Sequence, residues 1–109
     1  MMNGFIQVMT TVETKEQAQS IARYLVEEKL AACVQITGAT FSTYRWAGKI
    51  ETAREYLCLI TTREDLFARV ESAIKKLHSY ETPEIIAVPI VKGSDDYFKW
   101  MNQSLAGKI

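Results

Sequence analysis

The side chains best placed to do chemistry are aromatic residues that sit beside polar ones. They recur in three short stretches, as Tyr44 and Trp46, then Tyr80, then Tyr97 and Trp100. Tyr44 and Trp46 are two residues apart, so they share one face of a predicted strand. Rings placed among polar residues are typical of an interface or a pocket rather than of a plain core. The sequence therefore predicts an interface or ligand cleft built from these stretches.

A second set of side chains could bind a soft metal. Copper favours thiolate and imidazole ligands, and the chain offers Cys33, Cys58, one histidine (His78) and carboxylates such as Glu84. It has no CxxC and no HxH pair, so the metal signal is weak. The structural alternatives are a His78 cation at a helix C-terminus, a Cys33 thiol packed as a small hydrophobe, and a solvated Glu84.

Hydrophobic periodicity indicates the elements that must position these residues. The predicted strands are Phe5 to Val12, 31–46 with a bend at Gly38, 50–61 and 84–91. Thr14 and Gln17 form a capping box before a first helix, whose apolar face is expected to run from Ala18 to Val26. A second helix is expected from Thr61 or Thr62 to Leu77. A third follows Ser94, with Tyr97, Trp100, Met101 and Leu105 on its inner face.

This order of elements is that of an α+β, ferredoxin-like split βαβ fold, βαββαβ with an added C-terminal helix. The first and third strands are expected to be central. The fourth is expected at an edge, which suits Pro89 because proline cannot donate to a ladder. Residues 1–109 are predicted to be a single domain.

The hairpin between the second and third strands is long for this domain. Fully extended, residues 31–46 would span about 50 Å, whereas a domain of this size has a radius of gyration of about 13 Å. We expect the hairpin to bend at Gly38 or to project, and a projecting strand with exposed rings would pair with another copy of the chain. A closed homo-oligomer is the prediction, and a hairpin folded over its own sheet is the alternative.

Composition excludes several classes of protein. Thirteen basic and thirteen acidic side chains cancel, so neither nucleic acid nor a membrane surface is an expected partner. The N-terminal stretch lacks a signal peptide pattern and no apolar run is long enough to span a membrane. With two cysteines and no disulfide framework, we expect reduced thiols and a cytoplasmic location.

Four segments in order resemble one known family. They read EKLAACV at 28–34, YRWAGKI at 44–50, YETPEII at 80–86 and DYFKW at 96–100. Together they are similar to the CutA (CutA1) divalent-cation tolerance family over most of the chain. The resemblance implies a homotrimer assembled through the long hairpins, in the cytoplasm, with a role in tolerance of copper and other divalent metals.

The resemblance also bears on the site residues. It implies pocket or intersubunit pairing for Lys49 and Glu55, beside the alternative of solvated charge. Some members carry a cysteine late in the first strand that has been proposed as a copper ligand, whereas this chain has Thr10 there. A copper site would then use Cys33, with His78 and Glu84 as further candidates, and ligands shared between subunits are an option. No cofactor is expected to be required.

Other functions of the same fold fit the sequence less well. A trimeric small-molecule sensor like the PII proteins is the main alternative, but the chain lacks a Gly-rich phosphate loop. An acylphosphatase would want an arginine in the loop after the first strand, which here reads TVET at 11–14. An RNA-binding sheet would want glycine and aromatic residues in the third strand, which reads YLCLI at 56–60. We therefore expect no catalytic activity.

Overall fold

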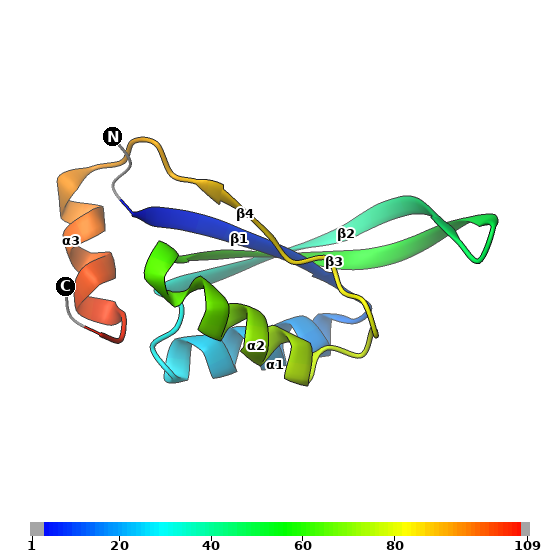
Figure 1. Cartoon of the computed structure of the whole chain (residues 1–109), viewed down its shortest axis with the longest axis horizontal. Coiled ribbons are helices and arrows are strands. Elements are labelled where there is room, and N and C mark those ends of the chain that lie inside the picture. Colours follow the sequence, from blue (N-terminus) through cyan, green and yellow to red (C-terminus); the bar gives the residue numbers. More distant parts are fainter. Residues whose placement is uncertain (1–3, 108–109) are drawn as a thin grey trace.

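The fold is an antiparallel sheet with two helices on one face and a third helix at one end (Figure 1). The computed structural model describes residues 4–107, so the outermost residues of the predicted 1–109 domain lie outside the described part. The elements are β1 (Phe5–Val12), α1 (Lys15–Glu27), β2 (Cys33–Trp46), β3 (Lys49–Arg63), a 3₁₀ turn (Glu64–Leu66), α2 (Phe67–Leu77), β4 (Ile86–Pro89) and α3 (Asp95–Ser104).

The strand order confirms the predicted ferredoxin-like fold. The sheet runs β2-β3-β1-β4 with every neighbouring pair antiparallel. β1 and β3 are central, as expected from their apolar runs, and β4 is an edge in which Pro89 sits at the last paired position, opposite Ile6. Because β4 is an edge strand, the missing N–H of Pro89 removes no hydrogen bond to a strand on its outer side.

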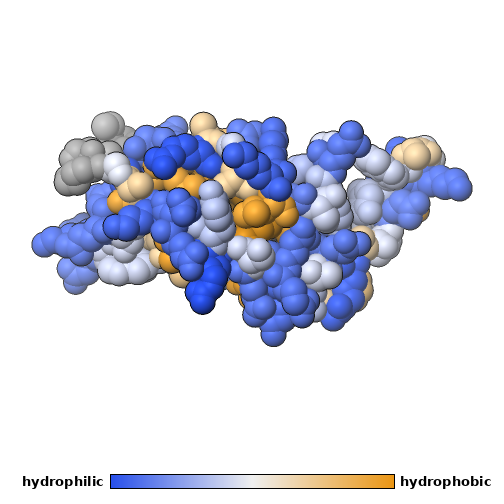
Figure 2. Space-filling model, turned by 90° about the horizontal axis from the view of Figure 1, so that it is seen from below, coloured by the Kyte–Doolittle hydropathy of each residue, from blue (hydrophilic) through white to orange (hydrophobic). Residues whose placement is uncertain are grey.

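The core lies between the sheet and helices α1 and α2. Thr14 caps α1 as predicted, because its hydroxyl accepts the N–H of Gln17 at 3.1 Å. On α1 itself, Ala18, Ile21 and Leu25 are buried against the core, but Val26 is 45 % exposed. The apolar stripe of α1 is therefore narrower than predicted. Seen from below, the surface is mostly hydrophilic, with hydrophobic side chains showing near its middle (Figure 2).

Three predicted elements have bounds that the structure corrects. β3 continues to Arg63 because Thr61, Thr62 and Arg63 still pair with the first residues of β1. A 3₁₀ turn then separates the strand from α2, so the helix begins at Phe67 rather than at Thr61 or Thr62. β4 is also shorter than residues 84–91, since only four of its residues pair with β1.

The β2–β3 hairpin both bulges and projects. The register shifts between Gly38 and Thr40, which places the predicted irregularity at Gly38. A Cβ at Gly38 would overlap the ring of Tyr56 on the facing strand, so only glycine fits there. Ala47 and Gly48 both have positive φ in the two-residue turn, at 52° and 79°, as tight hairpins require. The hairpin extends well beyond the body, and the molecule measures 45 × 28 × 22 Å (Figure 1).

Helix α3 packs with only part of its predicted inner face. Its cap is Ser94, as expected, whose hydroxyl accepts the N–H of Tyr97 at 3.2 Å. Met101 and Leu105 are buried, but Tyr97 and Trp100 are 43 % and 42 % exposed. Phe98 takes the inner position instead, because its ring stacks on Phe5 with centroids 4.4 Å apart.

One buried hydroxyl in the core predicts a stabilising substitution. Thr10 is fully buried on β1, and its Oγ1 has no hydrogen-bond partner among the described residues. We expect Thr10→Val to raise the free energy of unfolding by about 1 kcal/mol, since an unsatisfied buried hydroxyl is costly. Thr62→Val is the matched control, because Thr62 Oγ1 donates to the Leu30 carbonyl at 2.6 Å. Urea unfolding should move the two midpoints in opposite directions; a loss of stability in both variants would contradict the account of Thr10.

Candidate functional site

A pocket of about 480 Å³ opens where the hairpin leaves the body of the protein. The hairpin contributes Ser42, Thr43, Tyr44, Trp46 and Glu55. The segment after α2 contributes Tyr80, Glu81, Thr82 and Glu84, and β1 contributes Thr11. Its volume is in the range of small-molecule sites. The fold thus joins two of the three aromatic stretches that the sequence singled out.

Glu55 is the buried polar centre of this pocket. It is only 4 % exposed, although it is a carboxylate on the third strand. Ser42 donates its hydroxyl to Glu55 Oε1 at 2.6 Å, and Tyr80 donates its hydroxyl to Oε2 at 2.7 Å. Within residues 4–107 no lysine, arginine or histidine forms an ion pair with it. Two neutral donors therefore hold a buried acid that has no counter-charge among residues 4–107.

The same contact perturbs Tyr80. Burial raises the pKa of its phenol, and the hydrogen bond to Glu55 and the charge of that carboxylate raise the pKa further. Each cause favours the protonated phenol. Tyr80 is thereby kept as a hydrogen-bond donor to the carboxylate and is not a candidate proton acceptor near neutral pH.

We expect Tyr80 to ionise at a higher pH than a free tyrosine. The change is Tyr80→Phe, and the measurement is tyrosinate absorbance against pH for both proteins. The difference curve should lie above pH 10, the usual value for tyrosine. Because the folded pKa is raised, the folded state holds its proton when the unfolded state has lost it, so this group reduces stability as the pH rises past about 10. A difference curve centred at 10 would contradict the Tyr80–Glu55 contact.

His78 lies beside the pocket with both ring nitrogens engaged. It is buried at the C-terminus of α2, where Nε2 contacts the Thr11 carbonyl at 2.7 Å and Nδ1 accepts the Tyr80 N–H at 3.0 Å. These two partners require the tautomer that carries its proton on Nε2, so that Nε2 donates to the carbonyl and Nδ1 accepts. The ring therefore ties β1 to the segment that carries Tyr80, and metal binding would have to break one of these bonds.

The structure does not bring the three candidate metal ligands together in one chain. Glu84 lines the pocket, but Cys33 pairs with Thr61, six residues along β3 from Glu55, or roughly 20 Å at the rise of a strand. Within residues 4–107 no three His, Cys, Asp or Glu side chains are grouped closely enough to hold a metal ion. Cys58 is buried, and burial raises the pKa of its thiol to about 11. Cys33, which is half-buried, is the more accessible thiol.

The predicted interface residues lie in three separate places. Tyr44, Trp46, Glu55 and Tyr80 meet in the pocket, whereas Lys49 is exposed at the hairpin end opposite Trp46. Tyr97 and Trp100 contact each other on α3, with centroids 5.4 Å apart, at the end of the molecule away from the hairpin (Figure 1). Sequence reasoning missed Ser42, although its position two residues before Tyr44 places it on the same strand face.

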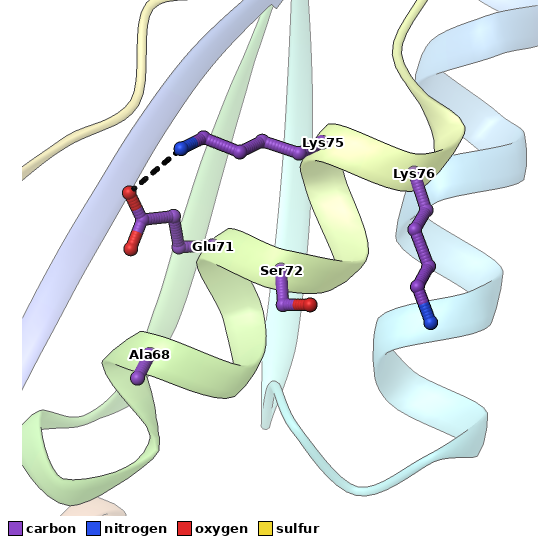
Figure 3. Close-up of a pocket in the computed structure, with 5 residues that line it drawn as sticks. All are labelled: Ala68, Glu71, Ser72, Lys75 and Lys76. Atoms are coloured by element: carbon purple, nitrogen blue, oxygen red, sulfur yellow. Dashed lines mark ion pairs between the residues drawn. The ribbon is translucent and has the colours of Figure 1, made fainter.

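A second depression lies on the outer face of α2 (Figure 3). Glu71 and Lys75 form an ion pair there at 3.4 Å, one turn apart. Both side chains are substantially exposed, so the pair is an ordinary solvated helix contact.

Among the described residues, no helix is both long enough and apolar enough to cross a bilayer.

Comparisons with known proteins agree on one family. The profile of the CutA1 divalent ion tolerance proteins matches residues 6–104. A divalent-cation tolerance protein CutA from Thermus thermophilus is 41 % identical over 89 % of this chain and 94 % of its own length. The solved CutA1 from Oryza sativa is 39 % identical with a TM-score of 0.93, covering 95 % of each chain. The CutA from Archaeoglobus fulgidus, described as periplasmic, is 39 % identical with a TM-score of 0.90, covering 92 % of this chain and 97 % of its own.

Proposed function

The chain belongs to the CutA1 family of divalent ion tolerance proteins, and from that premise we propose that it acts in tolerance of divalent metals as a non-catalytic homotrimer. The family match favours this function over a PII-like sensor. The observation that carries the assembly is the projecting hairpin, on which Phe41 and Ile50 are 69 % and 62 % exposed. Apolar surface of this extent is ordinarily covered by a partner.

The sheet edges support association with further copies of the same chain. β2 pairs only with β3, and β4 pairs only with β1, so within the described residues each has an outer edge without a strand partner. A long hairpin that leaves one body can cover such an edge on a second body. Repetition of the same contact around an axis closes a ring and leaves no free hairpin.

Copper enters this proposal through contacts between subunits. Cys33 is the more accessible of the two thiols. A copper site at Cys33 would take its other ligands from a neighbouring chain, because Glu84 and His78 of the same chain are not grouped with Cys33. Thiolate is the ligand that copper favours most among those this chain offers. We expect Cys33→Ser to lower copper binding and Glu16→Gln, on the exposed face of α1, to leave it unchanged.

The expected partners and cellular location are inferred from the net charge and the composition of the chain. The net charge of zero gives the chain no overall attraction to nucleic acid or to an anionic membrane surface. A cytoplasmic location stays a prediction.

The test of the function is growth in raised copper. A strain that lacks its own copy of such a protein would receive the wild-type chain or the Phe41→Glu, Ile50→Lys double variant. We expect the wild type to restore growth and the double variant to fail, with equal amounts of folded protein in both strains. Equal growth of the two strains would show that tolerance does not depend on the hairpin, and failure of the wild type would overturn the proposed function.

A further inference from the structure

The pocket at the base of the hairpin has a distinctive combination of side chains. Its acidic members are Glu55, Glu81 and Glu84, and its rings belong to Tyr44, Trp46 and Tyr80. Among the described residues that line it, none is lysine, arginine or histidine. Such walls repel anions and attract cations, both through the carboxylates and through the negative faces of the rings.

The depth of the carboxylates indicates what kind of cation fits. Glu55 is buried, whereas Glu81 and Glu84 are exposed at the mouth. Each oxygen of Glu55 accepts one hydrogen bond, from Ser42 or Tyr80, and a carboxylate oxygen can accept a second. A ligand with N–H donors can therefore complete the shell of Glu55 while its other end remains near the outer acids.

A buried acid held only by neutral donors also needs a counter-charge. Transfer of an unpaired charge out of water is expensive unless a partner compensates it. A bare metal ion is a poor occupant, because no three His, Cys, Asp or Glu side chains are grouped tightly enough among residues 4–107. The aromatic walls and the volume of about 480 Å³ instead suit an organic cation.

We propose that this pocket binds a short aliphatic amine with two ammonium groups, one on Glu55 and one near Glu81 and Glu84. The methylene chain lies against Tyr44 and Trp46. Loss of either ammonium group removes one of the two charge contacts. This assignment goes beyond metal tolerance and does not depend on a metal site.

The experiment uses Trp46 as the reporter. Trp100→Phe leaves Trp46 as the sole tryptophan, and the intact assembly is titrated with 1,4-diaminobutane at about 0.15 M salt, where surface attraction is screened. We expect a saturable change in emission, and no such change with 1,4-butanediol, which has the same chain without charge. An equal response to the diol, or none to the diamine, overturns the proposal.

Glu55→Gln in the same background tests the buried contact. It keeps the shape of the side chain and one of the two acceptor oxygens, replaces the other oxygen by an NH2 donor, and removes the charge. We expect affinity to fall at least roughly tenfold. Glu16→Gln is the matched control and should bind as the parent does. Should Glu55→Gln fail to fold, the Glu81→Gln, Glu84→Gln double variant, altered only at exposed positions, must weaken binding instead. Unchanged affinity in the folded variants overturns the proposal. Diamine binding that appears only in a Lys49→Gln variant also overturns it, because the natural occupant of the pocket would then be the Lys49 side chain of a neighbouring chain.

Discussion

Replacement of Arg63 by methionine is expected to lower the free energy of unfolding by about 3 kcal/mol, because several hydrogen bonds from a buried charged donor are lost together and the Ala106 and Gly107 carbonyls lose that partner. The Arg63 side chain is 5 % exposed. Its guanidinium donates to Asp65 at 2.6 and 3.1 Å, to Asn102 at 3.2 Å, and to the carbonyls of Ala106 and Gly107 at 2.8 Å each. These bonds fasten the end of α3 to the end of β3.

The measurement is urea unfolding at fixed protein concentration, since the proposed assembly would itself add stability. Arg69→Met, at an exposed position on α2, is the control and should be close to neutral. Hydrogen exchange at the Ala106 amide, which donates to the Lys29 carbonyl at 2.8 Å, should quicken in Arg63→Met alone. A change below about 1 kcal/mol with unaltered exchange would show that α3 is held by Phe98 and Met101 and not by this network.

The Phe41→Glu, Ile50→Lys double variant is expected to dissociate the proposed homotrimer. Burial of each large apolar side chain contributes about 1.5–3 kcal/mol, so loss of both should raise the dissociation constant at least roughly a hundredfold. Both residues are exposed on the projecting hairpin in the single chain, so the fold of the body does not require them. Sedimentation velocity should give a folded species of lower mass.

A matched change elsewhere separates assembly from general surface charge. Val91→Lys introduces a charge at a position that is 70 % exposed but lies after β4, outside the hairpin. It should leave the sedimentation coefficient unchanged. Dissociation by Val91→Lys to the same extent, or an intact assembly in the double variant, would place the interface away from the projecting hairpin.

Local signals predicted most of the fold. The capping residues Thr14 and Ser94 mark helix starts that the structure confirms. The order of strands and helices fixed the ferredoxin-like topology, because few arrangements join such elements without crossing connections. The start of α2 was missed because Thr61 and Thr62 resemble helix caps, while their pairing with β1 depends on a strand distant in sequence.

The candidate site was predictable only in part. Tyr44, Trp46, Glu55 and Tyr80 were singled out as residues, but the contact of Glu55 with Tyr80 spans 25 positions and depends on the path of the segment after α2. No periodicity describes that segment, so Glu81 and Thr82 gave no signal. Tyr97 and Trp100 were placed inward by helical spacing alone, whereas the stacking of Phe98 on Phe5 decides which face of α3 is buried.

The measurement that tests the central claim most directly is a native mass spectrum of the reduced wild-type protein, recorded with and without stoichiometric copper. The account predicts the mass of three chains in both samples, because the exposed hairpin residues need a partner whether or not a metal is present. Copper bound to that species should be lost in Cys33→Ser. A folded monomer in the sample without copper would contradict the account, since the exposed hairpin would then persist in water without a second copy.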